Sequence, residues 1–438
     1  MIAAITMCCT TISYAALLNI SPESVEAEAW TVIDSRTEQV IAEHNPDVQR
    51  APASLTKMMV AYIALKEIQA GRLDKHQILT ATSVVKNVMW DESQMHLKEG
   101  EKISIDQLLA GLIVMSANDA ALTLAEKIAG DVPSFIRRMN QEAKTLGMQH
   151  TNFQNPAGIT MPEHYSTAAD MAKLALALVN QTPDYLTYSQ QKCFVYNQRF
   201  HRATNLLLEL DPSVDGLKTG FTNAAGYNLA ATANRLTKDP QLAQRRLVVI
   251  ILGAKNAQKR AEIAQKLMNI SYNYSRNEIV LQPNHLLAEL PVHASTQKSY
   301  QLRTKQPTII TTSLYASDVP IDIEQFDQAS QRLVLKLANG IQQILEPNTA
   351  FKTHVNIVLA QPVLTAPLAQ NLLLATLHIY QNDQLLKSQN IEEQVEIIKA
   401  SWFEKLILWF QQIFPFFSSE EIKVKDYLSA KTKTKHSC

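Results

Sequence analysis

The stretch Pro52-Ala-Ser-Leu-Thr-Lys-Met-Met59 places a serine and a lysine three positions apart at the start of a predicted helix. Apolar residues recur over residues 55–69 at the spacing of a largely buried helix, and Gly71 follows as its end. Positions i and i+3 lie on one helical face, so Lys57 can reach the Ser54 hydroxyl. A serine nucleophile needs such a base, and Lys57 can act as one if burial or a neighbouring cation lowers its pKa.

Two further motifs follow in order along the chain, Ser116-Ala-Asn118 and Lys218-Thr-Gly220. We expect the first on a loop between a helix capped by Ser104 and a helix over residues 119–130. The second is predicted on a strand, where Gly220 would let a substrate backbone approach and Lys218 could be the cation beside Lys57. Taken singly, the three motifs could be a helix start, a pair of helix caps and an edge-strand turn. Together they indicate acyl transfer by a serine without a catalytic histidine.

The pattern of strands predicts two domains. Strand patterns at residues 29–33, 39–43, 225–233 and 246–252, with helices predicted between them, indicate a sheet built from both ends of an α/β (α+β) domain over residues 25–278. After Gln282-Pro283, short alternating runs predict a small all-β domain over residues 283–398. A chain of 438 residues is long enough for both.

The two ends of the chain differ from the rest. Residues 1–20 are uncharged and largely apolar, which predicts a signal peptide, although the missing basic start also fits an uncleaved anchor or a start site placed too far downstream. Residues 401–417 are rich in aromatic side chains and too short and polar to span a bilayer. They predict an amphipathic helix at a membrane surface, with a helix docked on the protein itself as the alternative. A polar tail over residues 418–438 follows.

Composition excludes several kinds of partner. Lys plus Arg equals Asp plus Glu, at 41 each, so no bulk charge favours a nucleic acid. The four cysteines form no CxxC pair and have no histidine at zinc-site spacing, so we expect no metal, no cofactor and no disulfide scaffold. Cys193 is expected to be a packed thiol.

Over residues 25–417 the chain resembles the D-alanyl-D-alanine carboxypeptidases of the low-molecular-mass penicillin-binding proteins, of the membrane-anchored type. The resemblance is carried by residues 52–59, Ser116-Ala-Asn-Asp-Ala120, His164-Tyr-Ser-Thr-Ala168, Val214-Asp-Gly-Leu-Lys-Thr-Gly220 and Ala225-Gly-Tyr-Asn228. It implies a penicillin-binding, serine β-lactamase-like transpeptidase fold, an antiparallel sheet with flanking helices. It also implies peptidoglycan stem pentapeptide as substrate and β-lactams as inhibitors. It also implies a location on the periplasmic face of the bacterial inner membrane.

The resemblance further implies roles for individual residues. Ser54 would attack the carbonyl between the two terminal D-alanines, and Lys57 would accept its proton. Ser116, Asn118, Lys218, Thr219 and Gly220 would hold the substrate or pass the proton, and the backbone N–H groups of Ser54 and Phe221 would form the oxyanion hole. Arg260 would receive the terminal carboxylate, unless it is a surface residue paired with Glu262. Some relatives carry a polar ring at the position of Phe221, and residues 235–244 form a longer connection than expected, which leaves the approach to Arg260 open.

Three other functions share parts of this pattern. A serine β-lactamase of class A needs a deacylating glutamate and an asparagine in its omega loop, and residues 155–170 offer Glu163 without that asparagine. A related endopeptidase would typically lack the appended domain. A noncatalytic wall-binding protein would not need intact Ser54, Lys57 and Lys218.

Overall fold

The computed structural model describes residues 16–413 except 316, 318 and 337–341, and leaves undescribed the side chains of 336, 342, 407, 408 and 410–413. Contacts divide the chain into two compact units, which are described separately below. The first unit comprises residues 1–279, 309–353 and 381–386, and the second comprises residues 280–308, 354–380 and 387–438.

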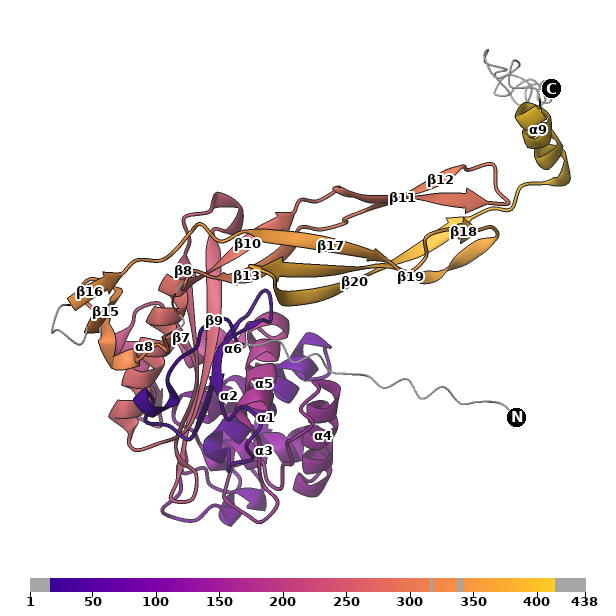
Figure 1. Cartoon of the computed structure of the whole chain (residues 1–438). Coiled ribbons are helices and arrows are strands. Elements are labelled where there is room, and N and C mark those ends of the chain that lie inside the picture. The colour runs from indigo at the N-terminus through magenta and orange to yellow at the C-terminus, as the bar shows by residue number, and fades with distance from the viewer. Residues whose placement is uncertain (1–15, 316, 318, 337–341, 414–438) are drawn as a thin grey trace, which may run out of the picture. The chain divides into compact units, whose positions relative to one another are not determined.

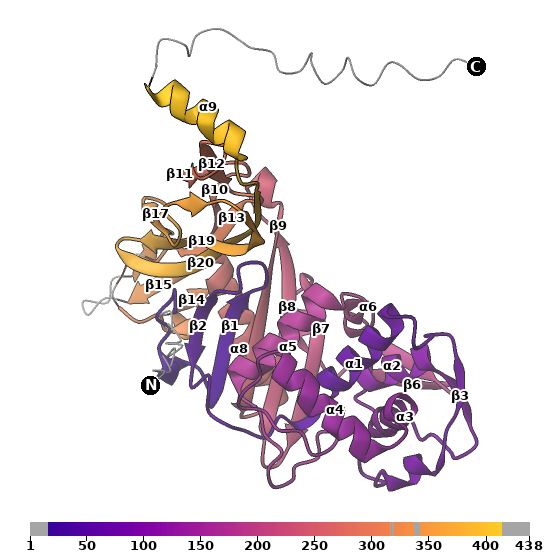
Figure 2. The same cartoon turned by 90° about the vertical axis from the view of Figure 1, so that its right-hand side faces the viewer.

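The first unit is built on a five-stranded antiparallel sheet in the order β2-β1-β9-β8-β7 (Figures 1 and 2). Its strands are β1 (Ala29–Asp34), β2 (Val40–His44), β7 (Val214–Thr222), β8 (Gly226–Leu236) and β9 (Gln244–Ala254). Along β9, Val248 and Ile250 belong to one apolar cluster, whereas Val249 and Ile251 belong to another. Side chains alternate between the two faces of a strand, so apolar material covers both faces of this sheet. The predicted antiparallel sheet with flanking helices is confirmed.

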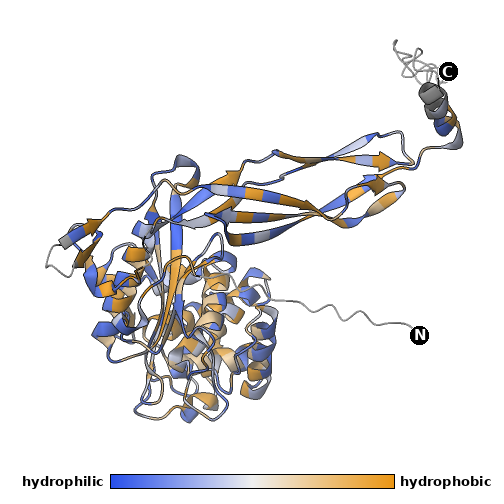
Figure 3. Cartoon of the chain, in the orientation of Figure 1, coloured by the Kyte–Doolittle hydropathy of each residue, from blue (hydrophilic) through white to orange (hydrophobic). Residues whose placement is uncertain are grey.

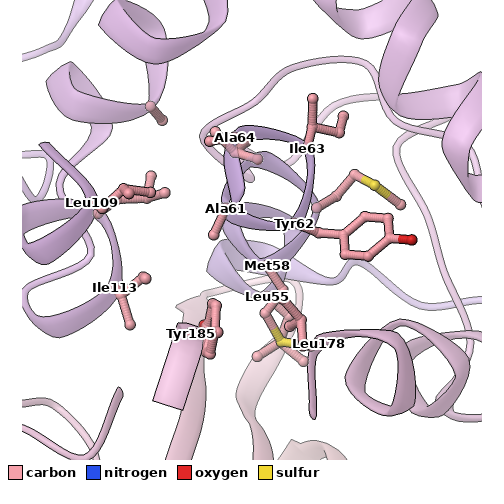
Figure 4. Packing of buried hydrophobic residues seen from close by; sticks show 14 of the residues in the cluster. Leu55, Met58, Ala61, Tyr62, Ile63, Ala64, Leu109, Ile113, Leu178 and Tyr185 are labelled. Atoms are coloured by element: carbon pink, nitrogen blue, oxygen red, sulfur yellow. The ribbon is translucent and has the colours of Figure 1, made fainter. Parts of the chain in front are cut away.

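Helices of the first unit cover one face of the sheet around the central helix α1 (Lys57–Gln69). In Figure 4, Met58, Ala61 and Tyr62 of α1 are surrounded by residues of the neighbouring helices, including Ile113, Leu178 and Tyr185. Those neighbours are α2 (Ile105–Val114), α3 (Asn118–Ala129), α4 (Val132–Thr145), α5 (Ala168–Gln181) and α6 (Tyr185–Ser189). Ser104 caps α2 in a capping box with Gln107, as predicted. Because α1 is buried among these helices, the residues at its start are held in position.

The opposite face of the sheet carries α8 (Ala257–Tyr274) and part of the segment that we expected in the β-rich domain. Phe326 and Leu333 pack in the same apolar cluster as α8, and the Tyr274 hydroxyl accepts a hydrogen bond from the Leu333 N–H at 2.8 Å. The prediction of one continuous module over residues 283–398 is therefore wrong for residues 309–353, because their apolar side chains complete the first unit.

The described part of the predicted signal peptide also packs in the first unit. Leu18 and Ile20 are buried, and the Leu18 N–H donates to the Ile41 carbonyl at 2.7 Å. A signal peptide that reached residue 20 would remove core residues, so a cleaved segment has to end before Leu18. The rest of that prediction, residues 1–15, lies outside the described residues.

The first unit contains several shorter elements. They are η1 (Pro22–Ser24), η2 (Ala53–Thr56), β3 (Ile78–Thr80), η3 (Ser83–Asn87), β4 (Lys102–Ser104), β5 (Cys193–Tyr196), β6 (Arg199–Arg202), α7 (Leu207–Leu210), η4 (Pro240–Leu242), η5 (Ile323–Gln325), β14 (Phe326–Asp327), β15 (Arg332–Lys336) and β16 (Gln342–Leu345). At its border with the second unit, β10 (Ser275–Leu281) and β13 (Thr308–Ser313) form a two-stranded sheet.

The second unit is rich in β-strands around its own apolar cluster, which includes Leu290, Leu302, Leu374 and Val395. Figure 3 shows hydrophobic and hydrophilic residues alternating along its long strands, as in strands with one buried face. Its strands are β11 (Leu286–His293), β12 (Ser299–Arg303), β17 (Thr353–Leu359), β18 (Leu364–Thr365), β19 (Leu368–Gln381) and β20 (Gln384–Ile397).

Helix α9 (Trp402–Ile413) follows β20 and matches the described part of the predicted terminal helix. The side chains of Trp402, Phe403, Leu406 and Trp409 are exposed. Within the described residues, no helix is both long and apolar enough to cross a membrane. The rest of the predicted helix and the polar tail, residues 414–438, lie outside the described residues.

Candidate active site

Ser54 and Lys57 are in direct contact at the start of α1. The Lys57 ammonium nitrogen Nζ lies 2.9 Å from Ser54 Oγ and donates to the Ala157 carbonyl at 2.5 Å. Lys57 is only 1% exposed, and burial lowers its pKa to about 7, although the carboxylates of Glu92 and Asp119 oppose that shift. Near neutral pH a large fraction of Lys57 is therefore the neutral amine that a general base requires.

Two glycines allow other segments to press against the backbone of Ser54. A β-carbon at Gly220 would lie 2.9 Å from the Ser54 nitrogen, and one at Gly158 would lie 2.0 Å from the Ala53 carbonyl oxygen. Ala53 itself adopts a φ of 50°, in the left-handed region. We expected Gly220 to make room for a substrate backbone, but the space beside it is occupied by the backbone of residues 52–54. Strand β7 and the loop before residue 159 thus fix the position of the nucleophile.

Lys218 lies in β7 with its side chain buried. Its Nζ donates to the Thr219 carbonyl at 2.9 Å, and the Thr219 hydroxyl lies 2.5 Å from that of Thr204. Burial holds the pKa of Lys218 well below its usual range, and the charges of Lys57 and Arg260 lower it further. Of the two causes that the sequence left open for a lowered pKa of Lys57, burial or a cation such as Lys218, burial is the main one.

Arg260 reaches the site from α8, on the other face of the sheet. Its guanidinium donates to the carbonyls of Asn228 at 3.0 Å and Gly220 at 3.4 Å, and its side chain is buried. The alternative of a surface residue paired with Glu262 is therefore wrong. Burial lowers the pKa of Arg260 to about 10, so it remains a cation at neutral pH.

An aromatic pair lies beside Arg260 at the turn between β7 and β8. The ring centroids of Phe221 and Tyr227 are 4.3 Å apart, and Phe221 is 49% exposed. The guanidinium carbon of Arg260 lies 5.8 Å from the centroid of the Tyr227 ring. Phe221 therefore offers an apolar ring to solvent next to a buried cation.

The Ser116-Ala-Asn118 motif forms the junction between α2 and α3, as predicted. Ser116 has a φ of 67°, and Asn118 is the first residue of α3. The Asn118 side-chain amide donates to the Glu92 carboxylate, and the Asn118 N–H donates to the Ser93 carbonyl at 2.7 Å. Helix α3, which begins at Asn118, packs against α1, and the carboxylates of Glu92 and Asp119 raise the pKa of Lys57 at the start of α1.

Two positioning residues were missed by sequence reasoning. Asn155 Oδ1 accepts hydrogen bonds from the N–H groups of residues 157–159, the turn whose Ala157 carbonyl receives Lys57. His164 Nδ1 accepts from the Gln154 N–H at 3.0 Å, while Nε2 lies 2.9 Å from the Thr56 hydroxyl. Burial lowers the pKa of His164 to about 4, so the ring is neutral and donates through Nε2. The Asn155-Pro-Ala-Gly158 turn was a sequence signal for the first of them.

The prediction for Cys193 is wrong. Cys193 is exposed, because it begins β5, a strand of a two-stranded hairpin that has no covering layer over this position. Across the described residues, no group of three His, Cys, Asp or Glu side chains is arranged to hold a metal ion.

A half-buried serine in contact with a buried lysine, with a second lysine and an arginine on the neighbouring elements, defines a serine acyl-transfer site without histidine. A family model described as D-alanyl-D-alanine carboxypeptidase matches residues 17–256, more than half of the chain, so the chain belongs to this family.

Individual relatives agree with the family assignment. D-alanyl-D-alanine carboxypeptidase DacD of Salmonella typhimurium is 37% identical over 252 residues, covering 56% of this chain and 63% of the relative, just under two thirds of its length. Penicillin binding protein 5 of Haemophilus influenzae superposes with a TM-score of 0.72 at 26% identity, covering 87% of this chain and all of that one. Penicillin-binding protein D2 of Listeria monocytogenes, in an ampicillin-bound form, has a TM-score of 0.50 at 30% identity and covers 57% of this chain and 98% of that one.

Proposed function

We propose that this protein is a serine D-Ala-D-Ala carboxypeptidase that removes the terminal D-alanine from peptidoglycan stem pentapeptides. The observation that carries the proposal is the buried Lys57 amine 2.9 Å from the Ser54 hydroxyl. A base with a pKa of about 7 in contact with a serine provides a nucleophile near neutral pH without a histidine.

The reaction proceeds in two acyl-transfer steps. Ser54 Oγ forms a bond to the carbonyl carbon between the two D-alanines while Lys57 takes the hydroxyl proton. The carbon–nitrogen bond then breaks, and the departing amine receives a proton through Lys57, with Ser116 as the relay. Water hydrolyses the ester on Ser54 in the second step. The N–H groups of Ser54 and Phe221 stabilise the oxyanion, and the closeness of β7 to the Ser54 backbone supports this pairing.

The terminal carboxylate of the substrate is bound on the β7 side of the site. Lys218 and Arg260 are buried there, and Arg260 holds the strand through the Gly220 carbonyl. Asn118 lies on the other side and holds the peptide carbonyl of the acyl part. Thr219 and Gly220 form the part of β7 that lies between these groups.

The direct test is release of D-alanine from a peptide ending in D-Ala-D-Ala by the full chain in detergent, with Ser54→Ala alongside. We expect release by the parent protein and none by the variant. Cleavage of cross-linked peptide dimers without D-alanine release would favour an endopeptidase. Rapid turnover of penicillin would favour a β-lactamase, and a stable penicillin adduct without peptide turnover would favour a wall-binding protein.

β-Lactams are proposed as inhibitors that acylate Ser54, and the ampicillin-bound relative supports this. A fluorescent penicillin is expected to label the parent protein and to leave Ser54→Ala unlabelled. Labelling of the variant would place the adduct on another residue.

We also propose that the protein acts on the periplasmic face of the inner membrane and binds the membrane surface through residues 401–417. Four exposed apolar side chains on α9 support this, since such residues enter the headgroup region of a bilayer. In a vesicle sedimentation assay, the full chain is expected to bind and a chain ending at residue 398 to stay in solution. The double variant Trp402→Glu and Trp409→Glu is the matched test, and undiminished binding by it would contradict the anchor.

A further inference from the structure

Glu92 is a carboxylate at the site that the proposed mechanism does not use. Its side chain accepts a hydrogen bond from the Asn118 amide and another from the Met89 N–H at 3.3 Å. Glu92 is partly exposed, in contrast to the basic side chains Lys57, Lys218 and Arg260, which are buried. Its carboxylate therefore reaches solvent beside Asn118.

The second carboxylate near Lys57 is not available to a substrate. Asp119 is 1% exposed, and its two oxygens accept hydrogen bonds from the N–H groups of Met95 and Leu97, each at 3.0 Å. These bonds attach the segment of residues 88–97 to the start of α3. Asp119 thus holds the segment, whereas Glu92 retains acceptor capacity, because a carboxylate has about four lone-pair positions.

The charged side chains of the site come from two groups of elements. Lys218 and Arg260 belong to β7 and α8, where the substrate carboxylate is proposed to bind, whereas Glu92 is hydrogen-bonded to Asn118 at the start of α3. In a peptide ending in D-Ala-D-Ala, the nitrogen of the last residue is part of the bond to be cleaved. A cationic group of the substrate must therefore belong to the acyl part, before the two D-alanines.

We propose that Glu92 is a specificity residue that binds a free side-chain amine on the residue preceding D-Ala-D-Ala. The inference rests on the proposed carboxypeptidase function. Met89 and Trp90 precede Glu92 on the same turn and are exposed, so they offer apolar surface to the methylene stem of such a side chain. The substrate class is then a stem peptide with a diamino acid whose distal amine is unmodified.

Two peptides of equal length test this specificity. Nα-acetyl-Lys-D-Ala-D-Ala keeps the side-chain amine, whereas Nα,Nε-diacetyl-Lys-D-Ala-D-Ala carries no charge there. For the full chain, kcat/KM for D-alanine release is expected to be about fivefold higher with the free amine, the size of a partly exposed ion pair. In Glu92→Gln this ratio falls to about one, whatever the absolute rates.

Asp91→Asn is the matched control, because Asp91 is an exposed carboxylate next to Glu92, and it is expected to keep the ratio of the parent. Equal rates for both peptides in the parent protein would overturn the inference alone. So would a Glu92→Gln variant that is slower on both peptides with an unchanged ratio, because Glu92 would then only orient Asn118. No D-alanine release from either peptide would overturn the proposed function and this inference with it.

Discussion

The first unit buries charged side chains in two different ways. Arg245 of β9 and Asp34 of β1 form an ion pair at 2.8 Å, and the guanidinium also donates to the carbonyl and hydroxyl of Ser275. At the site, Lys57, Lys218 and Arg260 are buried without an ion pair to any described carboxylate. A buried charge without a partner is costly, and the pKa values of all three fall below their ordinary ranges. The charges of Arg245 and Asp34 therefore stabilise the fold, whereas the basic side chains of the site are left without an ion-pair partner and serve the proposed chemistry.

The largest effect is expected at the lysine base. Lys57→Met removes the proton acceptor, so acylation of Ser54 by a fluorescent penicillin should slow by about 10³-fold. Stability should change by less than about 1 kcal/mol in urea unfolding, because an apolar side chain of similar length replaces a buried ionisable one. Acylation within tenfold of the parent rate would show that another group is the base.

Loss of the ion pair between Arg245 and Asp34 should have the opposite effect, lowering stability and leaving acylation unchanged. Arg245→Met leaves Asp34 buried without its partner and should lower the free energy of unfolding by about 3–5 kcal/mol, measured by urea denaturation. Acylation by the folded fraction should be unchanged. Arg246→Met is the control, since that pair with Asp215 is more exposed and should cost only about 1 kcal/mol. Equal losses in the free energy of unfolding for Arg245→Met and Arg246→Met would contradict the expected difference between the buried and the more exposed ion pair.

The smallest effect is a shift in pH dependence. Activity requires neutral Lys57, so kcat/KM should rise with pH through about 7. The charged groups that act on Lys57 are Glu92, Asp119 and Lys218, and the two carboxylates favour its protonated form. Glu92→Gln removes one of them, lowers the pKa of Lys57 and should move the acid limb to lower pH. If the acid side of the pH profile of kcat/KM stays in place or moves to higher pH in Glu92→Gln, the Glu92 carboxylate does not act on Lys57 as described.

Sequence reasoning worked where a motif is local. Ser54 and Lys57 share one turn, and the runs over residues 225–233 and 246–252 indicated the two neighbouring strands β8 and β9. It was less successful where a loop or a long connection sets the contacts. Glu92 reaches the site from the loop before β4, and Asn155 and His164 reach it from the connection between α4 and α5, so no periodicity relates them to Ser54.

Errors of assignment had similar physical causes. Cys193 was expected to be packed, but its hairpin leaves it exposed. Residues 309–353 alternate like a strand-rich module, yet their apolar side chains return to the first unit and cover α8. Alternation shows that one face is buried and does not show against which neighbour.

The chain passes between its two units at residues 279/280, 308/309, 353/354, 380/381 and 386/387. A module joined end to end to its neighbour can be released intact by a single protease cut. Here that does not hold, because every continuous fragment that contains all strands of the second unit also contains strands of the first. Limited proteolysis at one site is therefore expected to yield no fragment that consists of the second unit alone.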